Sequence, residues 1–304
     1  MTTEHVLATP EGLRGVSHFR ALLAMHGDDA DTDLEIRRAR LVAMAAAAAP
    51  PIGVTVTDTA VNNIRVLQID PPSWSGQAVY LHGGAYVLGS ADTHLRMAVK
   101  YAMASGARVW SIDYRLAPEH PYPAAVDDAT NVWKGVSENM PTVIVGDSAG
   151  GGLALALAKR VLSKGLSRPE AIALVSPWAD LTLANNSINT MATKEIMLSK
   201  RGLALDAERY RGAVPACDPN VSPALADLYD MPPLLVQVGS DEILYDDARM
   251  IADRVEAAGG NVRLQIWQGM THAWPAYGDL VPEAEASVKE VGLFCRKWLS
   301  HKDR

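Results

Sequence analysis

A serine flanked by small residues lies between an apolar run and an alanine-rich run. In "TVIVGDSAGGGLALALAKR", Gly146 and Gly150 flank Ser148, a strand pattern precedes it and a helix pattern follows. Such a turn can be a phosphate loop, which binds an anion on backbone N–H groups, or a nucleophile elbow, G-x-S-x-G, which exposes a serine hydroxyl. Because Gly152 occupies the position of the lysine that a phosphate loop requires, the sequence favours the elbow.

A serine hydroxyl becomes a nucleophile when a base takes its proton, and a histidine base needs an acid to orient it. In "LLVQVGSDEILYDD", Asp241 follows an apolar strand pattern, and "VRLQIWQGMTHAWP" places His272 after the next one. The chain order serine, acid, histidine is that of an α/β-hydrolase. We therefore predict Ser148 as the nucleophile, His272 as the base and Asp241 as the orienting acid.

Three neighbouring acids are alternatives to Asp241. Glu242, Asp246 and Asp247 lie further from the end of the strand pattern, and the last two fall on a predicted helix, where carboxylates are usually solvated. Asp241 itself has a second reading as the N-cap of that helix. We predict Asp241 because it lies nearest to the strand end.

A second glycine turn follows an earlier strand pattern, in "YLHGGAYVLG". Backbone N–H groups in such a turn stabilise the negative charge of a tetrahedral intermediate. We predict an oxyanion hole made from Gly83, Gly84 and Ala85, together with Ala149, which follows the serine. The alternative is a tight turn without a catalytic role.

Alternating strand and helix patterns position these turns. Helix patterns occupy residues 10–49 and precede any predicted strand, and residues 54–70 are typical of a hairpin around Asn62 and Asn63. Later strand patterns are separated by helix patterns and cover residues 77–84, 107–114, 142–145, 171–176, 233–240 and 262–267. This order predicts an α/β fold with a mostly parallel sheet, helices on both faces and a site at the carboxyl ends of the strands.

The alternation stops between Trp178 and Pro223, where helix patterns occur without a strand. We expect this insertion to join the N-terminal helices in a cap above the strand ends. The predicted division is a helical cap, residues 1–50 and 179–222, and a catalytic core, residues 51–178 and 223–304.

Composition excludes several other classes of protein. The 304 residues carry a net charge of −7, and hydrophobic residues make up 48%, which is typical of a globular domain and unlike a nucleic-acid-binding surface. The beginning of the sequence lacks a signal-peptide pattern and no apolar run is long enough to span a membrane, so we predict a cytoplasmic protein. Cys217 and Cys295 form neither a disulfide framework nor a metal-ligand pattern. His82 and His120 also lack metal-ligand spacing, and no cofactor is predicted.

Five motifs occur in a characteristic order: HGGAY, DYRLAPEHPYPAAVDDA, GDSAGGGLA, SDEILYDD and MTHAW. With them the chain resembles the hormone-sensitive-lipase-like α/β-hydrolases, bacterial esterase family IV. The resemblance implies a sheet of about eight strands, a helical cap, and hydrolysis of carboxylic esters with short acyl chains. It assigns the same catalytic and oxyanion residues, although Ala85 replaces the family's usual third glycine. It also implies a homodimer formed through an edge strand, for which residues 262–267 are the candidate.

The sequence therefore predicts a serine carboxylesterase for short- to medium-chain esters, which forms an acyl-enzyme on Ser148 and needs no metal or organic cofactor. Its predicted partner is a small-molecule ester, with no nucleic-acid or membrane partner. An amidase or a longer-chain lipase with the same triad is an alternative, because one acyl-enzyme chemistry serves all three. A non-catalytic receptor with a hydrolase fold is another, although such a receptor usually lacks a triad residue.

Overall fold

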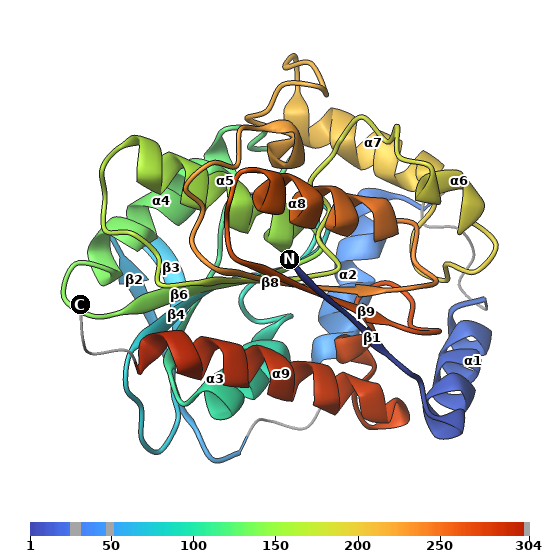
Figure 1. The fold of residues 1–304 in the computed structure, drawn as a ribbon, viewed down its shortest axis with the longest axis horizontal. Helices are drawn as coiled ribbons and strands as arrows, with labels where there is room; N and C mark the ends of the chain where they lie inside the picture. Colours follow the sequence, from blue (N-terminus) through green and yellow to red (C-terminus); the bar gives the residue numbers. More distant parts are fainter. Residues whose placement is uncertain (25–31, 47–51, 301–304) are drawn as a thin grey trace.

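A single nine-stranded sheet runs through the molecule, in the order β1-β9-β8-β7-β6-β4-β5-β3-β2. The computed structural model describes residues 1–24, 32–46 and 52–300 (Figure 1). The strands are β1 (Thr2–Val6), β2 (Thr55–Val61), β3 (Ile64–Asp70), β4 (Gln77–Leu81), β5 (Arg108–Ile112), β6 (Thr142–Asp147), β7 (Ile172–Val175), β8 (Leu234–Gly239) and β9 (Val262–Trp267).

The sheet is mostly parallel, as the sequence predicts. The antiparallel pairs are β2 with β3 and β3 with β5, and the other pairs of neighbouring strands are parallel. The turn between β2 and β3 lies at Asn62 and Asn63, whose φ angles of 49° and 66° fit a two-residue hairpin turn. The central strands β4, β6, β7 and β8 are buried on both faces, which explains why most of their residues are apolar.

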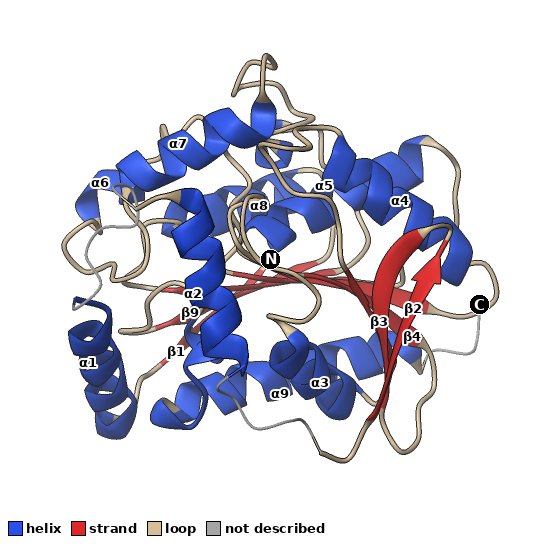
Figure 2. Ribbon diagram, turned by 180° about the vertical axis from the view of Figure 1, so that it is seen from behind, coloured by secondary structure: helices blue, strands red, loops and turns tan. Residues whose placement is uncertain are grey.

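Helices cover both faces of the sheet. In Figures 1 and 2, α3 and α9 lie on one face, and α4, α5 and α8 lie on the other. The helices are α1 (Pro10–Ala24), α2 (Leu34–Ala46), α3 (Leu95–Ser105), α4 (Ala124–Val136), α5 (Ala149–Ser163), α6 (Ser187–Thr190), α7 (Lys200–Arg211), α8 (Tyr245–Ala257) and α9 (Pro282–Leu299). Short 3₁₀ helices η2 (Pro223–Leu225) and η3 (Trp274–Leu280) interrupt the loops. Each buried helix thus packs an apolar face on the sheet.

The first strand corrects the predicted order of elements, in which helices precede any strand, and the predicted edge strand at residues 262–267. Residues 2–6 form β1, which pairs in parallel with β9, so a strand precedes the N-terminal helices and the first residues belong to the sheet. Glu4 of β1 accepts two hydrogen bonds from Arg263 of β9, at 2.7 Å each. Because β9 pairs with both β8 and β1, it is not the edge strand that the dimer prediction requires.

The two segments predicted to form the cap meet at a buried ion pair. Arg37 of α2 donates to both carboxylate oxygens of Asp206 of α7, at 3.0 and 2.8 Å. Helix α1 lies elsewhere, where Phe19 stacks on Tyr277 of η3 with ring centroids 4.0 Å apart. The N-terminal segment therefore lies at three places. Strand β1 forms the edge of the sheet, α1 packs on η3 and α9, and α2 contacts α7. The last residues of the predicted N-terminal cap segment, 47–50, lie outside the described residues.

Candidate active site

The carboxyl ends of β6 and β8 and the loop after β9 bring a serine, a glutamate and a histidine together. Ser148 lies between β6 and α5 with φ 54° and ψ −124°, a strained conformation for a residue other than glycine. Small neighbours permit this turn: a Cβ atom on Gly150 would lie 2.0 Å from the carbonyl oxygen of Leu81 in β4. The sharp strand-to-helix turn predicted from the sequence is thus present.

The three side chains form a continuous hydrogen-bonded chain. Ser148 Oγ lies 2.9 Å from His272 Nε2, and His272 Nδ1 lies 3.0 Å from Glu242 Oε2. A carboxylate only accepts hydrogen bonds, so Nδ1 donates to Glu242 and the neutral ring leaves Nε2 to accept the serine proton. All three side chains are buried. The arrangement is that of a nucleophile, a base and an acid that orients the base.

The prediction that Asp241 orients His272 is wrong. Asp241 Oδ1 instead accepts from Ser240 Oγ at 3.0 Å and from Lys194 Nζ at 3.1 Å. After β8 the chain turns so that the next residue, Glu242, points inward and is completely buried. The distance from the strand end, which favoured Asp241 in the sequence, does not report the direction in which a side chain points.

The second oxygen of Glu242 is also held in place. Glu242 Oε1 accepts from Ser176 Oγ at 2.9 Å and from the Gly239 N–H at 2.5 Å. Ser176, which sequence analysis missed, follows β7 directly and also accepts from the Ala273 N–H beside His272, at 3.2 Å. The sequence signal for Ser176 is the one that indicated Ser148 and His272: a polar side chain that follows a buried strand.

The electrostatic surroundings favour the protonated form of His272. Burial lowers the pKa of His272, but the hydrogen bond and charge of Glu242 outweigh burial and raise this pKa above its ordinary value of 6.5. Further negative charge comes from Glu195 and Asp147. The site therefore stabilises the imidazolium that forms when His272 removes the serine proton.

The glycine turn after β4 lies beside the serine. A Cβ atom built on Gly83 would lie 3.2 Å from the Cβ atom of Ser148. Gly84 has φ 118°, and its missing Cβ would lie 2.3 Å from the Leu88 carbonyl oxygen. Among the described residues, the N–H groups of Gly83, Gly84 and Ala85 have no hydrogen-bond acceptor. Backbone donors are thus available in a turn next to the nucleophile.

The His82 side chain stabilises this turn through a hydrogen bond. Burial, followed by the charge of His94, lowers the pKa of His82 to about 3, so its ring is neutral. His82 Nδ1 lies 2.7 Å from the Gly83 carbonyl oxygen and therefore donates to it. This bond orients the peptide group whose N–H belongs to Gly84.

Ala85 and Ala149 complete the predicted oxyanion set. Ala85 adopts φ 54°, so the residue that replaces the family's third glycine is in a strained left-handed conformation. Ala149 is the first residue of α5, and the N–H groups of a first helical turn have no acceptor within the helix. Both residues retain N–H groups at the turns that flank Ser148.

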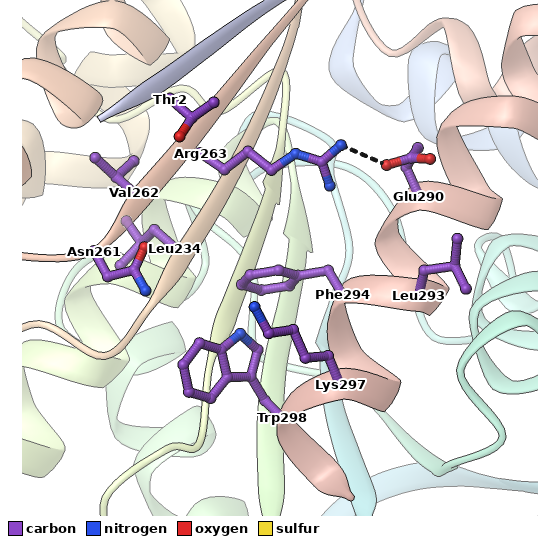
Figure 3. Close-up of a pocket in the computed structure, with 10 residues that line it drawn as sticks. All are labelled: Thr2, Leu234, Asn261, Val262, Arg263, Glu290, Leu293, Phe294, Lys297 and Trp298. Atoms are coloured by element: carbon purple, nitrogen blue, oxygen red, sulfur yellow. Dashed lines mark hydrogen bonds and ion pairs between the residues drawn. The ribbon is translucent and has the colours of Figure 1, made fainter. Parts of the chain in front are cut away.

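A surface pocket occurs at the opposite end of the strands (Figure 3). Its lining includes Leu234 and Val262, the first residues of β8 and β9, whereas the serine site lies at the carboxyl ends. Its Arg263 is already paired with Glu4 and Glu290.

Within the described residues, no group of three or more His, Cys, Asp or Glu side chains could hold a metal ion. No described helix has the length and apolar character needed to cross a membrane.

Comparisons with known proteins identify the family of the chain. A family model described as the alpha/beta hydrolase fold matches residues 78–276. The chain is 40% identical over 222 residues to an acetyl-hydrolase of Streptomyces hygroscopicus, covering 72% of this chain and 74% of that protein. It is similar to the crystal structure of EstE5 soaked with ethyl alcohol, with a TM-score of 0.91, 34% identity, and coverage of 96% of this chain and 100% of that one.

A second solved structure names the group more narrowly. An esterase from the bacterial hormone-sensitive lipase family superposes with a TM-score of 0.88 at 33% identity, covering 96% of this chain and 99% of that one. The family model covers well over half of the chain, and the motifs around Ser148 and His272 lie within it. The chain therefore belongs to the α/β-hydrolase superfamily, in its group of hormone-sensitive-lipase-like esterases.

Proposed function

We propose that the protein is a carboxylic ester hydrolase whose acyl-enzyme forms on Ser148. Ser148 Oγ attacks the ester carbonyl carbon while His272 Nε2 takes the hydroxyl proton, and Glu242 stabilises the resulting imidazolium. His272 then gives this proton to the leaving alcohol as the carbon–oxygen bond breaks. Water, deprotonated by His272, attacks the acyl group, which leaves as the carboxylic acid, and Ser148 recovers its proton.

The negative charge on the substrate oxygen needs donors during both steps. We assign this role to the N–H groups of Gly83, Gly84 and Ala149, with Ala85 as a further candidate. Removing one such donor typically costs about 3 kcal/mol of transition-state stabilisation. No step uses a metal ion or an organic cofactor.

One observation carries the proposal: the hydrogen-bonded chain from Ser148 through His272 to Glu242, with distances of 2.9 and 3.0 Å. A non-catalytic receptor has no need for such a complete chain in a buried site. The substrate proposed is a short- to medium-chain ester, supported by the name acetyl-hydrolase that a 40% identical relative carries.

The test uses p-nitrophenyl esters of increasing acyl length and an organophosphate that reacts with activated serines. We expect the wild-type protein to hydrolyse the shorter esters fastest and to be labelled on Ser148, as read by peptide mass spectrometry. Ser148→Ala should abolish both hydrolysis and labelling. The matched control is Ser163→Ala, because Ser163 lies exposed at the far end of α5.

Retention of most ester hydrolysis by Ser148→Ala would reject the acyl-enzyme mechanism. No turnover and no labelling of the folded wild-type protein would reject the esterase and favour a receptor. The cytoplasmic location and the homodimer stay predictions, which cell fractionation and analytical ultracentrifugation would test.

A further inference from the structure

A buried carboxylate from the insertion lies beside the triad. Glu195 belongs to the loop between α6 and α7 and is 7% exposed. Its Oε1 accepts from the N–H groups of Ile196 and Met197, at 2.8 and 2.9 Å. Its Oε2 lies 3.3 Å from the N–H of Ile243, in the turn after β8. Both oxygens thus act as acceptors for backbone N–H groups.

The contact to Ile243 has a neighbour, formed by the preceding residue of the insertion and by the residue on the other side of Glu242. Lys194 Nζ lies 3.1 Å from Asp241 Oδ1. Two consecutive residues of the insertion therefore bind the two residues that flank Glu242, one on each side. Of the two contacts, the one from Glu195 is made to the backbone and holds the turn directly after the triad acid, while the one from Lys194 is made to the Asp241 side chain.

The charge of Glu195 also reaches the base. The negatively charged groups that face His272 are Glu242 from the turn after β8, Glu195 from the insertion and Asp147 from the end of β6. Burial raises the pKa of Glu195, while the charge of His272 opposes this shift. Among the described residues, no lysine or arginine forms an ion pair with Glu195, and its carboxylate is bound by backbone N–H groups. It therefore adds to Glu242 in stabilising the imidazolium.

We infer that Glu195 is a positioning residue of the ester hydrolysis: its carboxylate holds the turn that presents Glu242 to His272 and places a second negative charge beside the imidazolium. The inference rests on the proposed function. It connects one short part of the insertion, at Glu195, with the turn that carries the triad acid.

The deciding variant is Glu195→Gln, which keeps the size of the side chain, removes its charge and replaces one acceptor oxygen by a donor. We expect kcat to fall about tenfold or more, because a displaced triad acid orients the base poorly, while KM changes little. We also expect the acidic limb of the pH profile of kcat/KM to move by about 0.5 to 1 unit toward lower pH. The limb reports the negative charge around His272 and would not respond to a loss of stability alone.

Two further variants complete the experiment. Glu208→Gln removes a charge from an exposed position on α7 in the same insertion and should leave kcat and the acidic limb unchanged. Glu195→Asp keeps the charge but shortens the reach to Ile243, so kcat should fall while the limb stays in place. Circular dichroism and thermal melting establish that each variant is folded.

Each outcome decides the inference. A Glu195→Gln variant with unchanged kcat, or with lower kcat and an unmoved limb, would overturn it. Should Glu195→Gln fail to fold, Glu195→Asp decides: lower kcat with an unmoved limb supports the inference, and wild-type kcat overturns it. Failure of the proposed function is seen separately, as absent wild-type turnover or as activity that survives Ser148→Ala.

Discussion

Side-chain length and direction decide which acid serves His272. Asp241 and Glu242 are neighbours in the turn after β8, but Asp241 contacts Ser240 and Lys194 near the surface, whereas Glu242 is fully buried against His272. Ser176 and Gly239 hold the second Glu242 oxygen. Asp241 makes none of these contacts with His272, Ser176 or Gly239.

We predict opposite outcomes for the two acids. Glu242→Gln removes the charge that stabilises the His272 imidazolium and can present an amide donor to Nδ1, so kcat should fall about 10³-fold or more. Asp241→Asn removes the charge of a partly exposed ion pair with Lys194 and keeps an acceptor oxygen for Ser240, so kcat should stay within about threefold of wild type. Steady-state kinetics on a p-nitrophenyl ester measures both. An inactive Asp241→Asn beside an active Glu242→Gln would return the role to Asp241.

The pKa of His272 determines the pH at which activity is lost on the acidic side of the profile. The base must be neutral to accept the Ser148 proton, and protonation at low pH blocks it. Because the pKa of His272 is raised above 6.5, activity should be complete above this raised pKa and fall as the pH decreases through it. We expect the acidic midpoint of kcat/KM above pH 6.5. A midpoint well below that value would show that burial outweighs Glu242.

At the scale of elements, short turns at strand ends hold the reacting groups. The turn after β4 passes so close to Leu88 that a side chain at Gly84 has no room. His82 holds the same turn through the Gly83 carbonyl group. Strand β4 lies next to β6 in the sheet, so this turn and the serine turn are neighbours.

We predict that Gly84→Ala disrupts the oxyanion turn. The residue has φ 118° and its Cβ would lie 2.3 Å from the Leu88 carbonyl oxygen, so the peptide must shift and kcat should fall about 10²-fold. Gly106→Ala is the control: its φ is also positive, at 62°, but its Cβ would meet no atom within 4 Å and it caps α3. It should cost about 1 kcal/mol of stability and leave kcat unchanged. Wild-type kcat in Gly84→Ala would exclude this turn from the oxyanion hole.

At the scale of the whole molecule, polar contacts tie distant segments to the site. The Arg37–Asp206 pair joins α2 to α7, with the side chains 8% and 2% exposed. Arg38 of the same helix donates to the carbonyl oxygens of Val87, beyond the glycine turn, and of Ala117. The N-terminal segment thus connects the insertion with the loop that supplies the oxyanion donors.

We predict that the buried pair contributes strongly to stability. Asp206→Ala leaves the buried Arg37 guanidinium without this carboxylate and should lower the free energy of unfolding by about 3 kcal/mol. The control Asp58→Ala breaks the pair with Arg65, whose side chains are 60% and 36% exposed, and should change it by less than about 1 kcal/mol. Urea denaturation measures both. Equal losses in the two variants would contradict a special role for the buried pair.

Most of the fold was predictable because its signals are local. Apolar runs such as residues 142–145 and 262–267 lie where the structure has β6 and β9, and the hairpin at Asn62 and Asn63 is confirmed. Strand β1 was missed because its sequence, TTEHV, has a single strongly apolar residue and an edge strand buries little. Only its pairing with β9 makes it a strand.

By itself, the sequence determined the superfamily, the sharp turn at Ser148 and the histidine that reaches it, because these depend on short motifs at the ends of apolar strands. The tertiary structure alone decided that Glu242 and not Asp241 contacts His272, since the direction of a side chain after a turn depends on what surrounds it. It also decided that Ser176 and Glu195, distant in sequence, lie at the triad. Those contacts join separate strands and the insertion, and no local pattern of residues records them.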